Sequence, residues 1–253
     1  MTNDKNKLFQ RSLVYELLSH AFARPTLNFM DFVESGEFCT HMVTSLKALP
    51  YCGNVDPHNI EVLANRVKAL RFDGVLSEYE EITSYKINYL YECNYQNRFS
   101  ALTEMADIAG FYKAFSYTYS GEKPDFLPME LEFMRMVILK EIRAIANEEG
   151  EKVEICAEVQ KGFLDSHIGR WIPLMASFLE PFTFYGPLAA FAHEWIQAEC
   201  TLMGIKPDVL DYVIGEDKIV DKIVDKVADE EQCPVAFVED WSKDHETLSK
   251  LYT

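Results

Sequence analysis

Two patterns of apolar residues flank a short acidic loop between residues 91 and 140, and they constrain the fold of this chain most. On both sides of the loop, apolar side chains recur every three or four residues, which is the spacing of one buried face of an α-helix. The positions are Met105, Ile108, Ala109, Tyr112 and Phe115 before the loop and Leu127, Leu131, Met134 and Ile138 after it. The segment therefore predicts two amphipathic helices joined by a connector.

The same periodicity runs through most of the chain, whereas the alternation typical of strands is nearly absent. Further stripes are Phe9, Leu13, Leu17 and Ala21, then Ile60, Leu63, Val67 and Leu70, then Leu188, Phe191, Trp195 and Leu202. Pro25 and Gly204 are placed to end two of these helices. We predict an all-α globular assembly of about nine to eleven helices, since helices usually span about 11–12 residues. Trp171 and Trp195 are expected in its core.

Two changes along the chain suggest internal boundaries. The loop from Ser120 to Pro128 contains Gly121 and Pro124, and it predicts a hinge near residues 120–128 between two subdomains. We expect an all-helical domain over residues 1–214. Residues 215–253 are predicted to form an acidic C-terminal helix and tail, because a four-residue repeat there is typical of a solvated amphipathic helix.

The charge balance is strongly acidic. The chain has 24 lysine and arginine residues against 41 aspartate and glutamate residues, which gives a formal net charge of −17. Such a surface repels phosphate backbones, so nucleic-acid binding is not expected. The charge attracts a basic partner, or it serves only to keep the protein in solution.

The sequence predicts a cytoplasmic protein. It lacks a stretch of about 18 or more apolar residues, so membrane insertion is not expected, and its polar N-terminus does not resemble a secretion signal. Its six cysteines are scattered without a CxxC pair, which favours reduced thiols over zinc binding or a disulfide framework.

No arrangement of residues predicts catalysis, a bound metal or a cofactor. Sequence patterns for nucleotide phosphates, zinc proteases, di-iron bundles and nucleophilic serines are missing. Glu16 and His20, four residues apart, are interpreted as a surface or capping interaction. Glu130 and Glu132 point to different faces of one predicted helix, and His167 is interpreted as a satisfied, partly buried histidine.

The acidic loop has two interpretations. Asp125 is placed to cap the helix that begins near Leu127 or Pro128. Alternatively, Glu122 and Asp125, held beside Pro124, present carboxylates to arginines of a partner, and both roles can hold together. The aromatic residues nearby are mostly expected in the core, while Tyr91 and Tyr95 at its edge are candidates to line an apolar groove.

Three segments resemble a known family. ADIAGFYKAFSY (106–117), EKPDFLPMELEFM (122–134) and FLDSHIGRWIP (163–173) resemble the TorD/DmsD/NarJ-type maturation chaperones of redox enzymes. The resemblance is closest to the delta-type assembly proteins of DMSO-reductase-family molybdoenzymes, such as nitrate reductases, and it is strong over residues 79–202. It implies an all-helical fold without catalysis. It also implies binding to the apo catalytic subunit, at its twin-arginine leader or its body, until the molybdopterin cofactor is inserted.

The resemblance also implies site residues. The family's Glu-x-Pro-Asp-His loop falls on Glu122, Pro124 and Asp125, with Phe126 in place of the histidine. These four residues are predicted to contact a partner or to act as a hinge. Weaker candidates for the same role are Tyr91, Glu92 and Asp107. The protein is expected to be a monomer or a homodimer.

Two other functions stay open at this point. One is a helical metal-dependent enzyme, and the other is a permanent structural subunit of the reductase.

Overall fold

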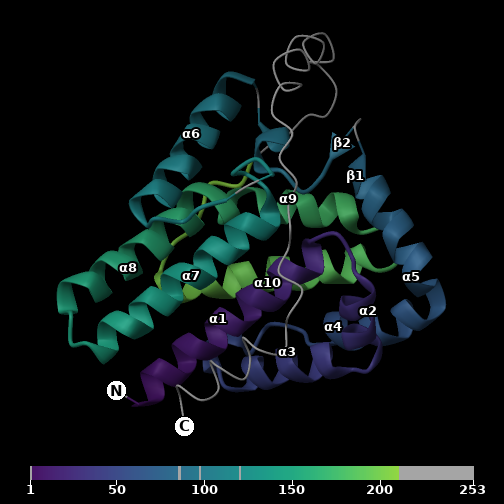
Figure 1. Cartoon of the computed structure of the whole chain (residues 1–253), viewed down its shortest axis with the longest axis horizontal. Helices are drawn as coiled ribbons and strands as arrows, with labels where there is room; N and C mark the ends of the chain where they lie inside the picture. Colours follow the sequence, from purple (N-terminus) through teal and green to yellow (C-terminus); the bar gives the residue numbers. More distant parts are fainter. Residues whose placement is uncertain (1, 85–86, 97, 120, 211–253) are drawn as a thin grey trace. The chain divides into compact units, whose positions relative to one another are not determined.

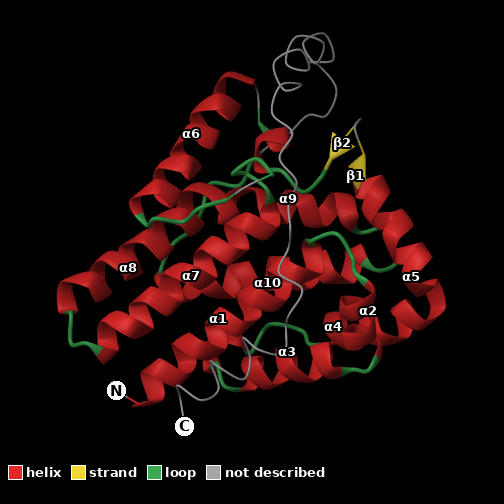
Figure 2. Ribbon diagram, in the orientation of Figure 1, coloured by secondary structure: helices red, strands yellow, loops and turns green. Residues whose placement is uncertain are grey.

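The computed structural model describes residues 2–84, 87–96, 98–119 and 121–210, and helices dominate this part of the chain (Figure 2). The α-helices are α1 (Thr2–Phe22), α2 (Leu27–Glu34), α3 (Glu37–Lys47), α4 (His58–Glu61), α5 (Leu63–Ile82), α6 (Arg98–Ala114), α7 (Leu127–Ala146), α8 (Gly150–Phe163), α9 (Gly169–Leu179) and α10 (Tyr185–Met203). Shorter elements are the 3₁₀ turns η1 (Pro50–Cys52) and η2 (Glu92–Tyr95), the π turn η3 (Leu164–Ile168), and the antiparallel strands β1 (Thr83–Ser84) and β2 (Ile87–Asn88). The predicted all-α class is confirmed.

The chain divides into two units. The first comprises residues 1–118 and 124–213, and the second comprises residues 119–123 and 214–253. The first unit contains every helix described here. The acidic C-terminal helix and tail predicted for residues 215–253 lie outside the described residues, and the hinge predicted near residues 120–128 stays a prediction.

Helix α7 runs through the core of the first unit. It packs along α1 on one side and α8 on the other, as Figure 1 shows. Its predicted stripe, Leu127, Leu131, Met134 and Ile138, is buried. The Phe133 ring adds an aromatic cluster, with centroids 4.9 Å from Tyr112 and 4.8 Å from Phe163. This burial fixes the orientation of α7, because turning the helix would expose several large apolar side chains.

Helix α10 forms a second buried element and contacts α9, α4 and α5. Trp195 on α10 and Trp171 on α9 are fully buried, as predicted. Leu202 was predicted on the same buried stripe, and this prediction is wrong: its side chain is 44% exposed. Burial on α10 ends at Cys200, so the last turn extends beyond the packed part of the helix. Gly204 then ends α10 in the left-handed region, with φ 65°, as predicted.

A buried ion pair joins the first and last helices of this unit. Arg11 on α1 donates from Nε to Glu199 Oε1 at 3.0 Å and from one terminal nitrogen to Oε2 at 2.6 Å. Tyr15 and Tyr51 donate hydroxyl hydrogen bonds to the same carboxylate at 3.1 and 2.6 Å. The Glu199 side chain is fully buried, so these donors replace its lost hydration.

The π turn η3 separates α8 from α9. The Gly169 N–H bonds to the Leu164 carbonyl five residues earlier, which inserts one extra residue into the helical path. A Cβ atom at position 169 would collide with this carbonyl oxygen and with the Pro207 ring. Glycine is therefore required for the close approach of these chain segments.

Among the described residues, none of the helices combines the length and the apolar character needed to cross a membrane.

Candidate functional site

The acidic loop is anchored to the turn η2 by backbone pairing. The Glu92 N–H donates to the Asp125 carbonyl at 3.0 Å, and the Leu127 N–H donates to the Leu90 carbonyl at 2.8 Å. The Tyr112 hydroxyl donates to the Pro124 carbonyl at 2.8 Å. These bonds fix residues 124–127, so this part of the predicted hinge is held on both sides.

Asp125 is 1% exposed and caps a different helix from the predicted one. Its Oδ2 accepts the Cys93 N–H at 3.2 Å, in the first turn of η2. Helix α7 begins after Phe126, which provides no side-chain cap. The predicted capping of α7 is therefore wrong, because backbone pairing with residues 90–92 directs the Asp125 carboxylate towards η2.

Phe126, which follows Asp125 in the acidic loop, is also buried. Its side chain is 6% exposed, and its ring centroid lies 5.1 Å from that of the half-buried Tyr91. Tyr95, predicted at the edge of a groove, is instead a core residue: it is 4% exposed and lies 5.3 Å from Trp171. Tyr95 is thus covered by Trp171 and Phe178 of α9.

His167 on η3 is the centre of a buried polar cluster. Its Nδ1 lies 3.3 Å from Glu92 Oε1 on η2, and its Nε2 lies 3.2 Å from Asp107 Oδ2 on α6. Burial favours the neutral imidazole, but the hydrogen bond and charge of Glu92, with the charges of Glu104 and Asp107, outweigh it and raise the pKa of His167. Two carboxylates facing both ring nitrogens favour an imidazolium that donates to each.

A second buried carboxyl group lies behind Glu92. Glu130 on α7 is fully buried, and its Oε2 accepts the Trp171 indole N–H at 3.2 Å. Burial, followed by the charges of Glu92 and Asp125, raises the pKa of Glu130 well above its usual value. Burial and these neighbouring charges therefore favour the protonated form of Glu130.

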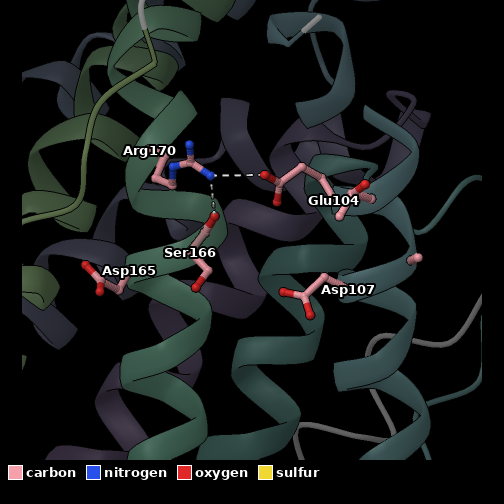
Figure 3. A pocket seen from close by; sticks show the side chains of 7 residues that line it. Glu104, Asp107, Asp165, Ser166 and Arg170 are labelled. Carbon is pink, nitrogen blue, oxygen red and sulfur yellow. Dashed lines mark hydrogen bonds and ion pairs between the residues drawn. The ribbon is translucent and has the colours of Figure 1, made fainter. Parts of the chain in front are cut away.

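The exposed side of the cluster opens into a shallow cleft of about 680 Å³ between α6 and the η3–α9 segment. Figure 3 shows Glu104 and Asp107 on one wall and Ser166 and Arg170 on the other. Arg170 spans the gap by donating to Glu104 Oε1 at 3.2 Å and to the Ser166 carbonyl at 3.2 Å. The cleft thus combines a bridging ion pair with the exposed carboxylate of Asp107.

The predicted site residues fall into two groups. Glu92 and Asp107 meet at His167, whereas Pro124, Asp125 and Phe126 form the anchored loop with Tyr91 against η2. Glu122 is exposed and belongs to the second unit.

Sequence reasoning missed the central role of His167 and the contributions of Glu104, Glu130 and Arg170. One pattern could have identified Glu130: it lies three residues after Leu127 on the buried stripe of α7, where a carboxylate requires a partner. Glu130 is thus a charged residue among the buried apolar side chains of α7.

Residues 71–177 match the family described as nitrate reductase delta subunit. This segment contains the anchored loop, η2 and the His167 cluster, and the match confirms the predicted resemblance over it. No curated protein matches the chain.

Proposed function

We propose that this protein is a cytoplasmic maturation chaperone for a molybdopterin-containing oxidoreductase of the nitrate reductase type. It binds the apo catalytic subunit, holds it while the cofactor is inserted, and then dissociates without catalysing a reaction itself. The observation that carries this proposal is the match of residues 71–177 to the nitrate reductase delta subunit family. The net charge of −17 supports it, because a basic twin-arginine leader would be attracted electrostatically.

The loop residues are assigned different roles in this proposal. Glu122 is exposed and contacts the partner directly. Asp125 is buried and acts as a positioning residue, since its carboxylate holds the first turn of η2 and its backbone holds Glu92. The proposed hinge lies ahead of Pro124, because residues 124–127 are anchored by three backbone-directed hydrogen bonds.

The main test is capture of the partner by the full-length chain. The catalytic subunit is expressed with and without molybdopterin synthesis, and binding to the tagged chaperone is measured for each form. We expect binding of the cofactor-free form and at least tenfold weaker binding of the loaded form. Equal binding to both forms, or this chain at equal stoichiometry in the purified active enzyme, would favour a permanent subunit.

One variant tests the loop, and a second variant outside it is the control. Glu122→Gln is expected to weaken binding of the apo subunit without changing thermal stability, because the side chain is exposed. Glu158→Gln, which removes an exposed carboxylate on α8, is the matched control and is expected to leave binding unchanged. If both variants weaken binding equally, general acidity rather than the loop carries recognition. Added salt should weaken the complex in either case.

A further inference from the structure

The buried cluster around His167 contains more carboxylate oxygens than the protein satisfies. Glu92 Oε2 and, behind it, Glu130 Oε1 are shielded from solvent, and within the described residues neither oxygen has a hydrogen-bond partner. Uncompensated carboxylate charge in a protein interior is costly, and a bound cation is one way to remove the cost.

Glu92, together with Glu104 and His167, is arranged as a set of metal ligands. One atom each from Glu92, Glu104 and His167 lies within 4.8 Å of the others. His167 Nδ1 is 3.3 Å from Glu92 Oε2 and 3.7 Å from Glu104 Oε2. Ligand atoms around a tetrahedral ion with bonds of about 2.1 Å are separated by about 3.4 Å, so the three atoms can surround one cation with little movement.

The surrounding residues orient these ligands. Asp107 faces the other imidazole nitrogen at 3.2 Å and can accept its N–H, so Nδ1 can bind a metal once it has given up its own proton. Arg170 holds Glu104 Oε1, so that Oε2 is directed towards His167. The cleft that exposes Glu104 and Asp107 provides an entry path and room for water ligands.

We propose that Glu92, Glu104 and His167 bind a divalent first-row transition metal ion, with Asp107 and Arg170 as orienting residues. One imidazole nitrogen and two carboxylate oxygens suit Zn²⁺, Mn²⁺ or Fe²⁺ better than a thiolate-seeking ion. The ion joins η2, α6 and η3, and it displaces the proton from His167 Nδ1. This proposal does not depend on the proposed chaperone function.

The test is titration of the full-length protein, stripped with a chelator, with ZnCl₂ in competition with a coloured chelator. We expect one equivalent of Zn²⁺ to bind and to raise the Tm. Glu104→Gln should weaken binding at least tenfold, and Asp107→Asn should weaken it by about 10–100-fold, which is typical of an orienting carboxylate. Glu104 is partly exposed, so its variant is expected to fold, as circular dichroism would verify.

Asp165→Asn is the matched control, because Asp165 lines the same cleft but lies outside the three ligands. Its affinity for Zn²⁺ should equal that of the unaltered protein. The proposal is overturned if no equivalent binds, if Glu104→Gln binds as well as the unaltered protein, or if Asp165→Asn weakens binding as much as Glu104→Gln does. The last result would indicate diffuse binding to an acidic surface.

Discussion

From the buried ion pair between Arg11 and Glu199, we predict how much the free energy of unfolding falls when the pair is broken. Glu199→Gln keeps the shape of the side chain but removes the charge that compensates Arg11. Burial disfavours the Arg11 charge, yet Glu199 outweighs this effect and raises the pKa of Arg11, so the guanidinium stays charged inside the protein. Breaking a buried pair by removing one partner costs about 3–5 kcal/mol. For a chain of this size, that loss lowers the Tm by roughly 6–20 °C.

The assay is urea unfolding followed by tryptophan fluorescence, since Trp195 lies 5.6 Å from the Tyr15 ring beside the pair. Tyr51→Phe removes one hydrogen bond to the charged carboxylate and should cost about 1.5–3 kcal/mol. The double variant Arg11→Met/Glu199→Met removes both charges. Its loss of stability should be smaller than the sum of the losses of Arg11→Met and Glu199→Met measured separately. A cost below about 1 kcal/mol for Glu199→Gln, or strict additivity in the double variant, would refute the reasoning.

Four further predictions concern other parts of the chain. Burial lowers the pKa of His20 below its usual value of 6.5, although Glu16 acts in the opposite direction. As the pH falls, the unfolded chain therefore binds this proton before the folded chain does. The free energy of unfolding should then decrease as the pH drops below about 6.5. His20→Gln should flatten this part of the stability curve, as measured by urea midpoints across pH. Phe126→His should cost about 1–3 kcal/mol, because it places an imidazole where a 6% exposed ring packs on Tyr91; an unchanged urea midpoint would contradict this. Gly169→Ala should lower the Tm, because its methyl group meets the Leu164 carbonyl, whereas Gly110→Ala on α6, with open space around it, should not. A fragment of residues 71–177 alone should give the circular dichroism of a largely unfolded chain, because it lacks α1, which covers α7.

The helices could be predicted from the sequence because the periodic spacing of apolar residues that indicates a helix lies within one short segment of the chain. The stripe from Leu127 to Ile138 shows its period within a few turns, and the structure buries it as predicted. The partners of the polar side chains could not be predicted, because they come from distant segments. Asp125 binds an N–H group 32 residues earlier, and His167 meets Glu92 across 75 residues. Local sequence indicated a cap at Asp125 but could not say which helix it caps.

Tyr95 illustrates the same limit for apolar residues. Its position at the end of an aromatic segment favoured an edge, yet Trp171 and Phe178 of α9 cover it. Which aromatic residues are covered depends on the path of α9, and that path depends on the π turn before it.

The π turn has a consequence for how this protein can change over evolution. One residue of an α-helix corresponds to a rotation of about 100°, so deleting a single residue from 164–168 would turn α9 by about that angle relative to α8. Trp171 would then lose its hydrogen bond to Glu130, and Arg170 would lose its contact with Glu104, although all four residues would still be present. The His167 cluster thus depends on the number of residues in this turn as much as on their identity. Related chains that keep the residues but lose the extra position should lack the cluster.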